Sequence, residues 1–203
     1  MERDSEKTRT RILEAVGGLL ARKGFAGMGV NAIARASGVD KVLIYRYFGG
    51  LRELLREYAT RGGFWPTIAE LAGKPLAALG DPVDFAAALL AGHLRELRRR
   101  PITQEIMRWE LHERNELTDE LARFREQQGI EILGLAPGGF EADGTRDPVA
   151  AAALIQAGLT YLVLRAKTAD VYLGIDLRDE AGWGRLTRAA EGLVRAYLKG
   201  VPS

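Results

Sequence analysis

Apolar residues recur every three to four positions along most of the chain, which is the spacing that places them on one face of an α-helix. The first such stretch covers residues 6–23, where Ile12, Val16 and Leu20 share a face. Gly24 follows and is expected to end the helix. Strand-like alternation is scarce and no internal repeat is present. The pattern therefore predicts an all-α protein of about nine helices without a sheet.

Two short helices are predicted next, at residues 30–36 and 40–47, joined by a turn that contains glycine. This arrangement is the form of a helix-turn-helix, whose second helix enters the major groove of DNA. Ile33, Ile44 and Phe48 have the spacing to pack both helices onto the first one. The pattern predicts an N-terminal three-helix helix-turn-helix domain.

A longer helix over residues 51–71 is expected to connect this domain to the rest of the chain, with Gly62, Gly63 and Pro66 bending or loosening its far half.

Proline marks the helix starts of the remaining chain. Asp81-Pro82 and Asp147-Pro148 each pair an N-capping aspartate with proline at the first helical position, and Pro101 opens another helix. Further helices are predicted at 117–135, 148–169 and 181–199, with a glycine-rich loop at 136–145.

The helix at 148–169 is apolar nearly all round, so it has to be covered on both sides. Together with the helix at 181–199, two copies would form an intersubunit four-helix bundle, which makes the protein a homodimer. The alternative is an ordinary buried helix within one subunit. A membrane span is not expected, because Gln156 and Thr160 interrupt the run and Arg165 ends it.

Charge is distributed unevenly. The net charge is +2 over 203 residues. Residues 1–58 hold eleven Lys and Arg against seven Asp and Glu, whereas the remainder holds eighteen against twenty. A basic N-terminal part on a slightly acidic body suggests a polyanion partner for that part alone. The charged N-terminus lacks the apolar stretch of a signal peptide, and the absence of cysteine fits a reducing compartment, so a soluble, cytoplasmic protein is expected.

The second helix of the helix-turn-helix carries basic and aromatic residues on its outer side. Lysine and tyrosine hydroxyls suit phosphate oxygens, while Arg46 suits a guanine edge or another phosphate. The predicted DNA contacts are Asn31, Lys41, Val42, Leu43, Tyr45, Arg46, Tyr47 and Arg52.

Several motifs fall in register with a known family. They are Thr10-Arg-Ile-Leu-Glu-Ala, Lys23-Gly-Phe, Ile33-Ala, Ala36-Ser-Gly-Val39, Leu43-Ile-Tyr-Arg-Tyr-Phe48 and Glu53-Leu-Leu55. Over about fifty residues the chain thereby resembles the N-terminal domain of the TetR family. The resemblance implies a homodimeric transcriptional regulator on a palindromic operator, usually a repressor that a small-molecule effector releases. It does not identify the effector, and it implies no cofactor.

Three positions depart from the family pattern. Gly29 precedes the second helix where Ser or Thr is usual, Leu43 replaces a threonine, and Leu51 replaces a lysine. Val42 or Leu43 would instead meet a thymine methyl. Binding should then depend more on Lys7, Arg9, Lys41 and Arg52. A helical ligand-binding protein with a weakened DNA-binding domain therefore stays open as an alternative.

Candidates for the effector site are mostly aromatic, since such pockets are largely apolar with a few polar anchors. They are Trp65, Phe85, His93, Met107, Trp109, His112 and Tyr161. A small helical enzyme using Glu105, Glu110 or His112 is a remoter alternative, because the few serines and the absence of cysteine leave no evident nucleophile. No metal site is expected.

The sequence thus predicts a DNA-binding domain at residues 1–50 and an effector-binding and dimerisation domain at 51–203.

Overall fold

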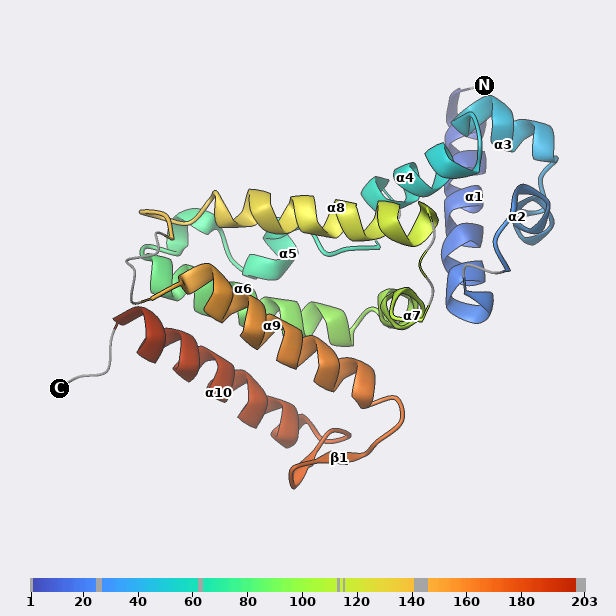
Figure 1. Ribbon diagram of the computed structural model, residues 1–203. Helices are drawn as coiled ribbons and strands as arrows, with labels where there is room; N and C mark the ends of the chain where they lie inside the picture. Colours follow the sequence, from blue (N-terminus) through green and yellow to red (C-terminus); the bar gives the residue numbers. More distant parts are fainter. Residues whose placement is uncertain are drawn as a thin grey trace. The chain divides into compact units, whose positions relative to one another are not determined.

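The computed structural model describes residues 2–24, 27–61, 64–112, 114, 116–140 and 146–199. In this part the chain forms ten α-helices, one 3-10 helix and one short hairpin (Figure 1). The all-α class is thereby confirmed. The elements are α1 (Glu2–Lys23), α2 (Val30–Ser37), α3 (Lys41–Phe48), α4 (Leu51–Arg61), α5 (Ile68–Ala72), η2 (Leu76–Ala78), α6 (Pro82–Arg98), α7 (Pro101–Glu110), α8 (Glu116–Leu133), α9 (Pro148–Arg165), β1 (Val171–Tyr172), β2 (Ile175–Asp176) and α10 (Glu180–Lys199).

The chain divides into two compact units. Unit 1 comprises Met1–Trp65 with Arg100–Gln128, and unit 2 comprises Pro66–Arg99 with Gly129–Ser203. Helix α7 and the part of α8 up to Gln128 thus belong with the N-terminal helices. The functional division at residue 50 stays a prediction.

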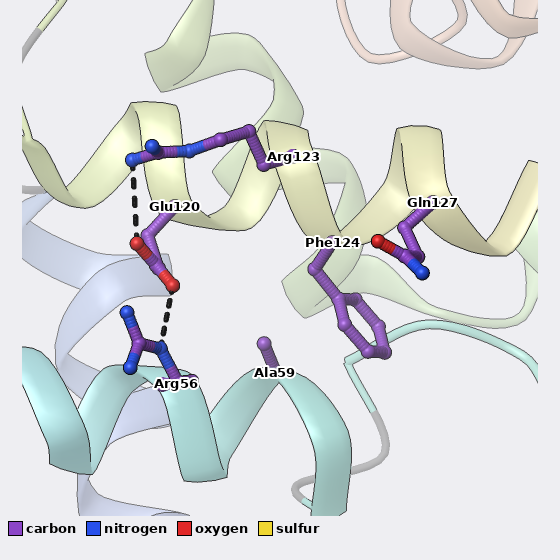
Figure 2. Close-up of a pocket in the computed structure, with 6 residues that line it drawn as sticks. All are labelled: Arg56, Ala59, Glu120, Arg123, Phe124 and Gln127. Carbon is purple, nitrogen blue, oxygen red and sulfur yellow. Dashed lines mark hydrogen bonds and ion pairs between the residues drawn. The ribbon is translucent and has the colours of Figure 1, made fainter.

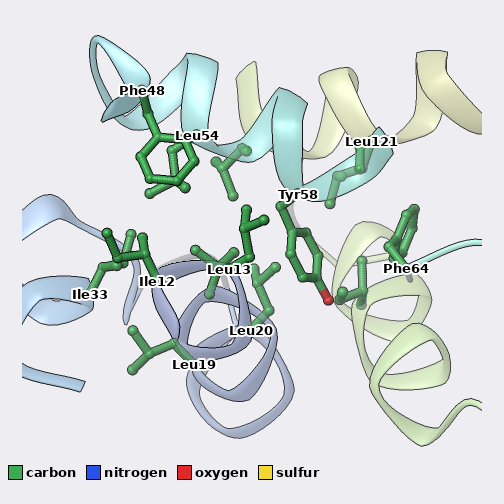
Figure 3. Packing of buried hydrophobic residues seen from close by; sticks show 14 of the residues in the cluster. Ile12, Leu13, Leu19, Leu20, Ile33, Phe48, Leu54, Tyr58, Phe64 and Leu121 are labelled. Atoms are coloured by element: carbon green, nitrogen blue, oxygen red, sulfur yellow. The ribbon is translucent and has the colours of Figure 1, made fainter. Parts of the chain in front are cut away.

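Unit 1 is built around α1, whose predicted apolar face is buried. Ile12, Val16 and Leu20 have no exposed surface, and they pack with Ile33 and Ile44 of the next two helices. Figure 3 shows side chains of α4, Phe64 and Leu121 of α8 completing the same cluster. The sequence pattern predicted this core up to α4, whereas the share of α7 and α8 appears only in the structure.

Unit 2 is built around α6, which packs against α5, α9 and α10. At Gly92 of α6, an added Cβ would lie 1.7 Å from the carbonyl oxygen of Leu71. Only glycine allows α5 to approach α6 in this way. Phe85 and Leu90 of α6 are buried in two apolar clusters.

Two predicted helix starts are confirmed. The Asp81 carboxylate accepts a hydrogen bond from the backbone N–H of Asp84 at 2.8 Å, and that of Asp147 accepts from Ala150 at 2.9 Å. Each aspartate satisfies an N–H group that the helix itself leaves unpaired.

The prediction of one connecting helix over residues 51–71 is wrong. Helix α4 ends at Arg61, and α5 begins at Ile68 with Thr67 as its N-cap. Thr67 and Glu70 form a reciprocal capping box, which starts a new helix rather than continuing the old one. Gly62 and Gly63 lie outside the described residues.

The expectation of no sheet is also wrong. Val171 pairs with Asp176 and Tyr172 with Ile175 in an antiparallel hairpin. Its turn places Leu173 at φ +48° and Gly174 at φ +75°. Consecutive positive φ values suit the twist of a two-residue hairpin turn. Leucine rarely adopts them, so this turn was not predicted.

Helix α9 is far more exposed than its composition predicts. Only Leu159 and Val163 are buried, whereas Leu154 is 76% and Tyr161 52% exposed. By length and composition alone, the helix is long and apolar enough to cross a membrane, contrary to the expectation from sequence. Such criteria are also met by helices that pack against protein.

Candidate nucleic-acid interface

The turn between α2 and α3 is fixed by local hydrogen bonds. Gly38 caps α2 in the left-handed conformation at φ +66°, and Asp40 caps α3 by accepting from the backbone N–H of Val42. The Ser37 hydroxyl donates to the carbonyl of Ile33 at 2.7 Å. The local sequence therefore sets the angle at which α3 leaves α2.

Helix α3 turns one side to the core and the other to solvent. Ile44 and Phe48 are buried, whereas Lys41, Val42, Tyr45 and Arg46 are exposed. We call these four exposed residues the reading face. The exposed fractions of Val42 and Tyr45 are 62% and 54%. Two cations beside exposed apolar and aromatic groups match the mixture of phosphate and base-edge contacts in a major groove.

Two of the residues predicted to contact DNA are less exposed than the reading face. Leu43 and Tyr47 are half-buried, and Tyr47 packs against the core cluster of unit 1. Asn31 on α2 and Arg52 on α4 are exposed beside this helix-turn-helix. Gly29 stands at the N-cap of α2, where Ser or Thr is usual in the family. No side chain therefore caps the start of this helix.

Arg9 has a structural place that the sequence analysis missed. Its Nη1 donates to the carbonyl of Tyr47 at 2.9 Å, its Nη2 pairs with the Glu57 carboxylate, and its guanidinium lies 4.8 Å from the centre of the Phe48 ring. The side chain is only 23% exposed. One signal was available: Arg9 stands three and four positions before Ile12 and Leu13, on the apolar side of α1.

The seven residues predicted for the effector site are divided between the units. Trp65, Met107, Trp109 and His112 belong to unit 1. Trp109 lies against Gly24, where an added Cβ would meet its ring at 2.4 Å, so this tryptophan closes the end of α1. Met107 and Trp65 are half-buried, and His112 is exposed.

The other three, Phe85, His93 and Tyr161, belong to unit 2. Phe85 is buried against Phe140, with ring centroids 6.3 Å apart. The buried His93 shares a 2.9 Å hydrogen bond with the Thr160 hydroxyl, and burial lowers its pKa to about 4. Tyr161 is exposed and meets the Tyr172 ring edge-on. Their joint role in one site stays a prediction.

The two carboxylates named for the enzyme alternative form ion pairs with arginines. Glu105 pairs with Arg108 at 3.2 Å, and Glu110 pairs with Arg125 at 2.6 Å. Among the described residues, no group of three His, Asp or Glu side chains is placed to hold a metal ion.

Sequence comparison identifies the N-terminal part. Residues 12–58 match the family model described as bacterial regulatory proteins, tetR family. Over 52 residues the chain is 44% identical to the HTH-type transcriptional repressor SCO4008 of Streptomyces coelicolor, a segment that covers 26% of the chain and 27% of that repressor. The chain thus aligns with about a quarter of this relative's length.

Similar solved structures extend over nearly the whole chain. The fatty acid degradation regulator FadR from Bacillus halodurans has a TM-score of 0.64 at 20% identity, covering 96% of both chains. NalD, the secondary repressor of the MexAB-OprM multidrug efflux pump in Pseudomonas aeruginosa, has a TM-score of 0.63 at 24% identity, covering 97% of this chain and 96% of its own. A TetR family regulator from Marinobacter aquaeolei VT8 has a TM-score of 0.66 at 16% identity, covering 95% and 98%. At these identities the likeness concerns the fold.

The α2–α3 unit and its exposed reading face define a helix-turn-helix protein. Its residues 12–58 match the family model of the tetR bacterial regulatory proteins, and the chain shares the fold of the solved TetR-family regulator from Marinobacter aquaeolei VT8. The resemblance found in the sequence is thereby confirmed.

Proposed function

We propose that this protein is a sequence-specific DNA-binding transcriptional regulator, acting in the cytoplasm as a repressor that a small-molecule effector releases from its operator. The reading face carries the proposal: Lys41, Val42, Tyr45 and Arg46 all lie on the exposed side of α3, and the Asp40 cap and Arg9 hold this helix at its two ends. Regulators of this family are not enzymes, and we propose no catalytic activity.

Two reading faces are needed for a palindromic operator, whose half-sites lie about one helical turn of DNA apart. We infer that a second copy covers the exposed apolar side chains of α9 and α10, namely Val149, Leu154, Tyr161 and Leu193. Small exposed residues of α9, such as Ala157 and Gly158, allow close approach of a neighbouring helix. This supports dimerisation through the two predicted helices.

The test is binding of the purified protein to fragments of its own upstream DNA over a salt series. We expect tight binding to a palindrome, with log affinity falling linearly with log salt concentration. The triple variant Lys41→Ala, Tyr45→Ala and Arg46→Ala should lose this binding while keeping its helical circular dichroism signal. A triple alanine variant at Lys23, Lys74 and Arg99 removes three exposed cations that belong to none of α3, α9 and α10, and it serves as the control.

Weak binding, equal for every sequence and indifferent to the triple variant on α3, would contradict the proposal. It would favour the ligand-binding protein with a weakened DNA-binding domain, the alternative that Gly29, Leu43 and Leu51 suggest.

A further inference from the structure

A small cleft lies in unit 1 between α4 and residues 120–127 of α8 (Figure 2). Its volume is about 240 Å³. Six residues line it: Arg56, Ala59, Glu120, Arg123, Phe124 and Gln127. None of them was a candidate for the effector site in the sequence, although all lie within the segment 51–203 that was expected to bind an effector.

Two guanidinium groups converge on one carboxylate at the cleft. Arg56 Nε donates to Glu120 at 2.7 Å, and a terminal nitrogen of Arg123 donates to its other oxygen at 3.3 Å. The two cations lower the pKa of Glu120, which is therefore held as the anion. Arg56 and Arg123 are 56% and 65% exposed, whereas Glu120 is 14% exposed. Since a guanidinium carries five donors, both arginines keep donors within reach of a second anion.

The other end of the cleft carries an aromatic ring. Figure 2 shows Phe124 and Ala59 away from the ion pairs, with the side chain of Gln127 next to Phe124. The cleft is smaller than the roughly 300–1,000 Å³ of pockets that take drug-sized ligands. It therefore suits a small molecule with a carboxylate at one end and a ring or short chain at the other.

Helix α4 connects this cleft to α3, the helix that carries the reading face. Arg56 pairs with Glu120 of α8, and the next residue, Glu57, pairs with Arg9. Arg9 in turn holds the carbonyl of Tyr47 near the end of α3. A ligand carboxylate that competes with Glu120 for Arg56 would loosen α4 from α8 and shift the helix on which the end of α3 is held.

We propose that the cleft binds a small organic carboxylate with a short apolar body, and that the bound anion weakens operator binding. The binding of the carboxylate is inferred from the cleft alone, whereas its effect on operator binding rests on the proposed DNA-binding function. A ligand lowers operator affinity only if it binds the DNA-released state better, and the coupling is then reciprocal.

The first experiment uses the full-length protein without DNA and titrates it with sodium benzoate by calorimetry at constant ionic strength. We expect saturable binding, with benzyl alcohol and sodium acetate binding at least about tenfold more weakly, because each lacks one half of the ligand. Equal binding of benzyl alcohol, or the absence of any benzoate binding, would overturn the proposal.

Variants locate the site. Arg56→Gln and Arg123→Gln should each weaken benzoate binding about tenfold or more, as expected when a charge-assisted hydrogen bond is lost. Phe124→Leu should weaken benzoate binding and leave acetate binding unchanged. Arg188→Gln, at an exposed arginine of unit 2, is the matched control. Benzoate binding that is the same in all four variants would refute the site.

The second experiment repeats the operator titration with benzoate against an equal concentration of sodium chloride. We expect benzoate to lower operator affinity at least about tenfold in the wild type and not in Arg56→Gln. An unchanged affinity would overturn the regulatory half. If the wild type bound no DNA while benzoate binding still required Arg56, the proposed function would fail and the cleft would stand.

Discussion

At the scale of single residues, the cations of unit 1 lie in two kinds of environment. Lys41 and Arg46 on the reading face are exposed, as phosphate and base contacts require. Arg9 is largely enclosed and bridges Tyr47 and Glu57. We therefore expect Arg9 to position the reading helix rather than to contact DNA, although from sequence it was counted among the DNA-binding cations.

Replacing Arg9 tests this assignment. Arg9→Lys keeps the charge but cannot bridge two acceptors as the planar guanidinium does, so operator affinity should fall about tenfold. The slope of log affinity against log salt concentration should stay unchanged, because no phosphate contact is removed. The measurement is operator binding across a salt series.

Two further variants distinguish an Arg9 that positions α3 from an Arg9 that contacts DNA. Glu57→Gln should weaken operator binding to a similar extent, and the double variant should lose little more than either single one, since both belong to one interaction. Lys41→Ala is the comparison, with an expected reduction of the salt slope by about 1. A similar reduction in Arg9→Lys, with additive losses, would show that Arg9 contacts phosphate.

His93 makes the stability of unit 2 depend on pH. Burial lowers its pKa to about 4, so the folded protein keeps the ring neutral while the unfolded chain takes up a proton near pH 6.5. Stability contributed by neutral His93 is therefore present above pH 6.5 and is lost as the pH falls towards 4, by about 3 kcal/mol in total. Urea unfolding between pH 6.5 and 5 measures this, before most carboxylates titrate.

His93→Gln should flatten this part of the pH profile. His112→Gln changes an exposed histidine and should leave the profile as in the wild type. An equal slope in the wild type and His93→Gln would rule out His93 as its origin.

At the scale of elements, the sequence predicted helices best where a local signal marks their ends. Asp81 and Asp147 cap as expected, and Gly38 marks the turn of the helix-turn-helix. Prediction failed at two places for different reasons. The capping box of Thr67 and Glu70 is a local signal that was overlooked, whereas the turn at Leu173 uses a residue that rarely adopts positive φ.

The candidate sites also differ in whether the sequence could predict them. The exposed side of α3 followed from helical spacing, because Ile44 and Phe48 had to face inward. The cleft at Arg56 and Glu120 was not predictable, since it joins helices 64 residues apart in the chain and no periodicity within either helix reports on the other.

The crossing of α5 and α6 depends on one glycine. In Gly92→Ala, the added Cβ would lie 1.7 Å from the Leu71 carbonyl oxygen, so the two helices would have to separate. We expect the free energy of unfolding to fall by about 2–3 kcal/mol, the usual cost of overpacking. Chemical denaturation followed by circular dichroism measures the change.

Gly129→Ala is the matched control. Gly129 lies within α8 with nothing within 4 Å of its added Cβ, so alanine should raise the free energy of unfolding by about 0.5–1 kcal/mol. A Gly92→Ala variant as stable as this control would show that α5 does not pack on α6 as described.

At the scale of the whole molecule, the exposed apolar surface requires an explanation. Soluble monomers rarely expose a helix as apolar as α9, on which Leu154 is 76% exposed. The hairpin continues this surface, because the Tyr172 ring contacts Tyr161 and Leu173 is 88% exposed. A second copy of the chain would cover these groups and supply the second reading face.

A charge on α9 therefore tests the assembly as a whole. Leu154→Arg should convert a dimer into monomers in sedimentation, because an arginine in an apolar interface leaves a buried, unpaired charge. Operator affinity should fall by about 10²–10⁴-fold, since the two reading faces no longer bind as one molecule. Leu111→Arg is the matched control: Leu111 is 78% exposed, but it belongs to unit 1, and its replacement should leave both the dimer and operator binding intact. A wild type that sediments as a monomer would contradict the dimer, whereas a Leu154→Arg variant that stays dimeric would place the dimer interface elsewhere. Either result would leave the exposed side of α9 to another partner.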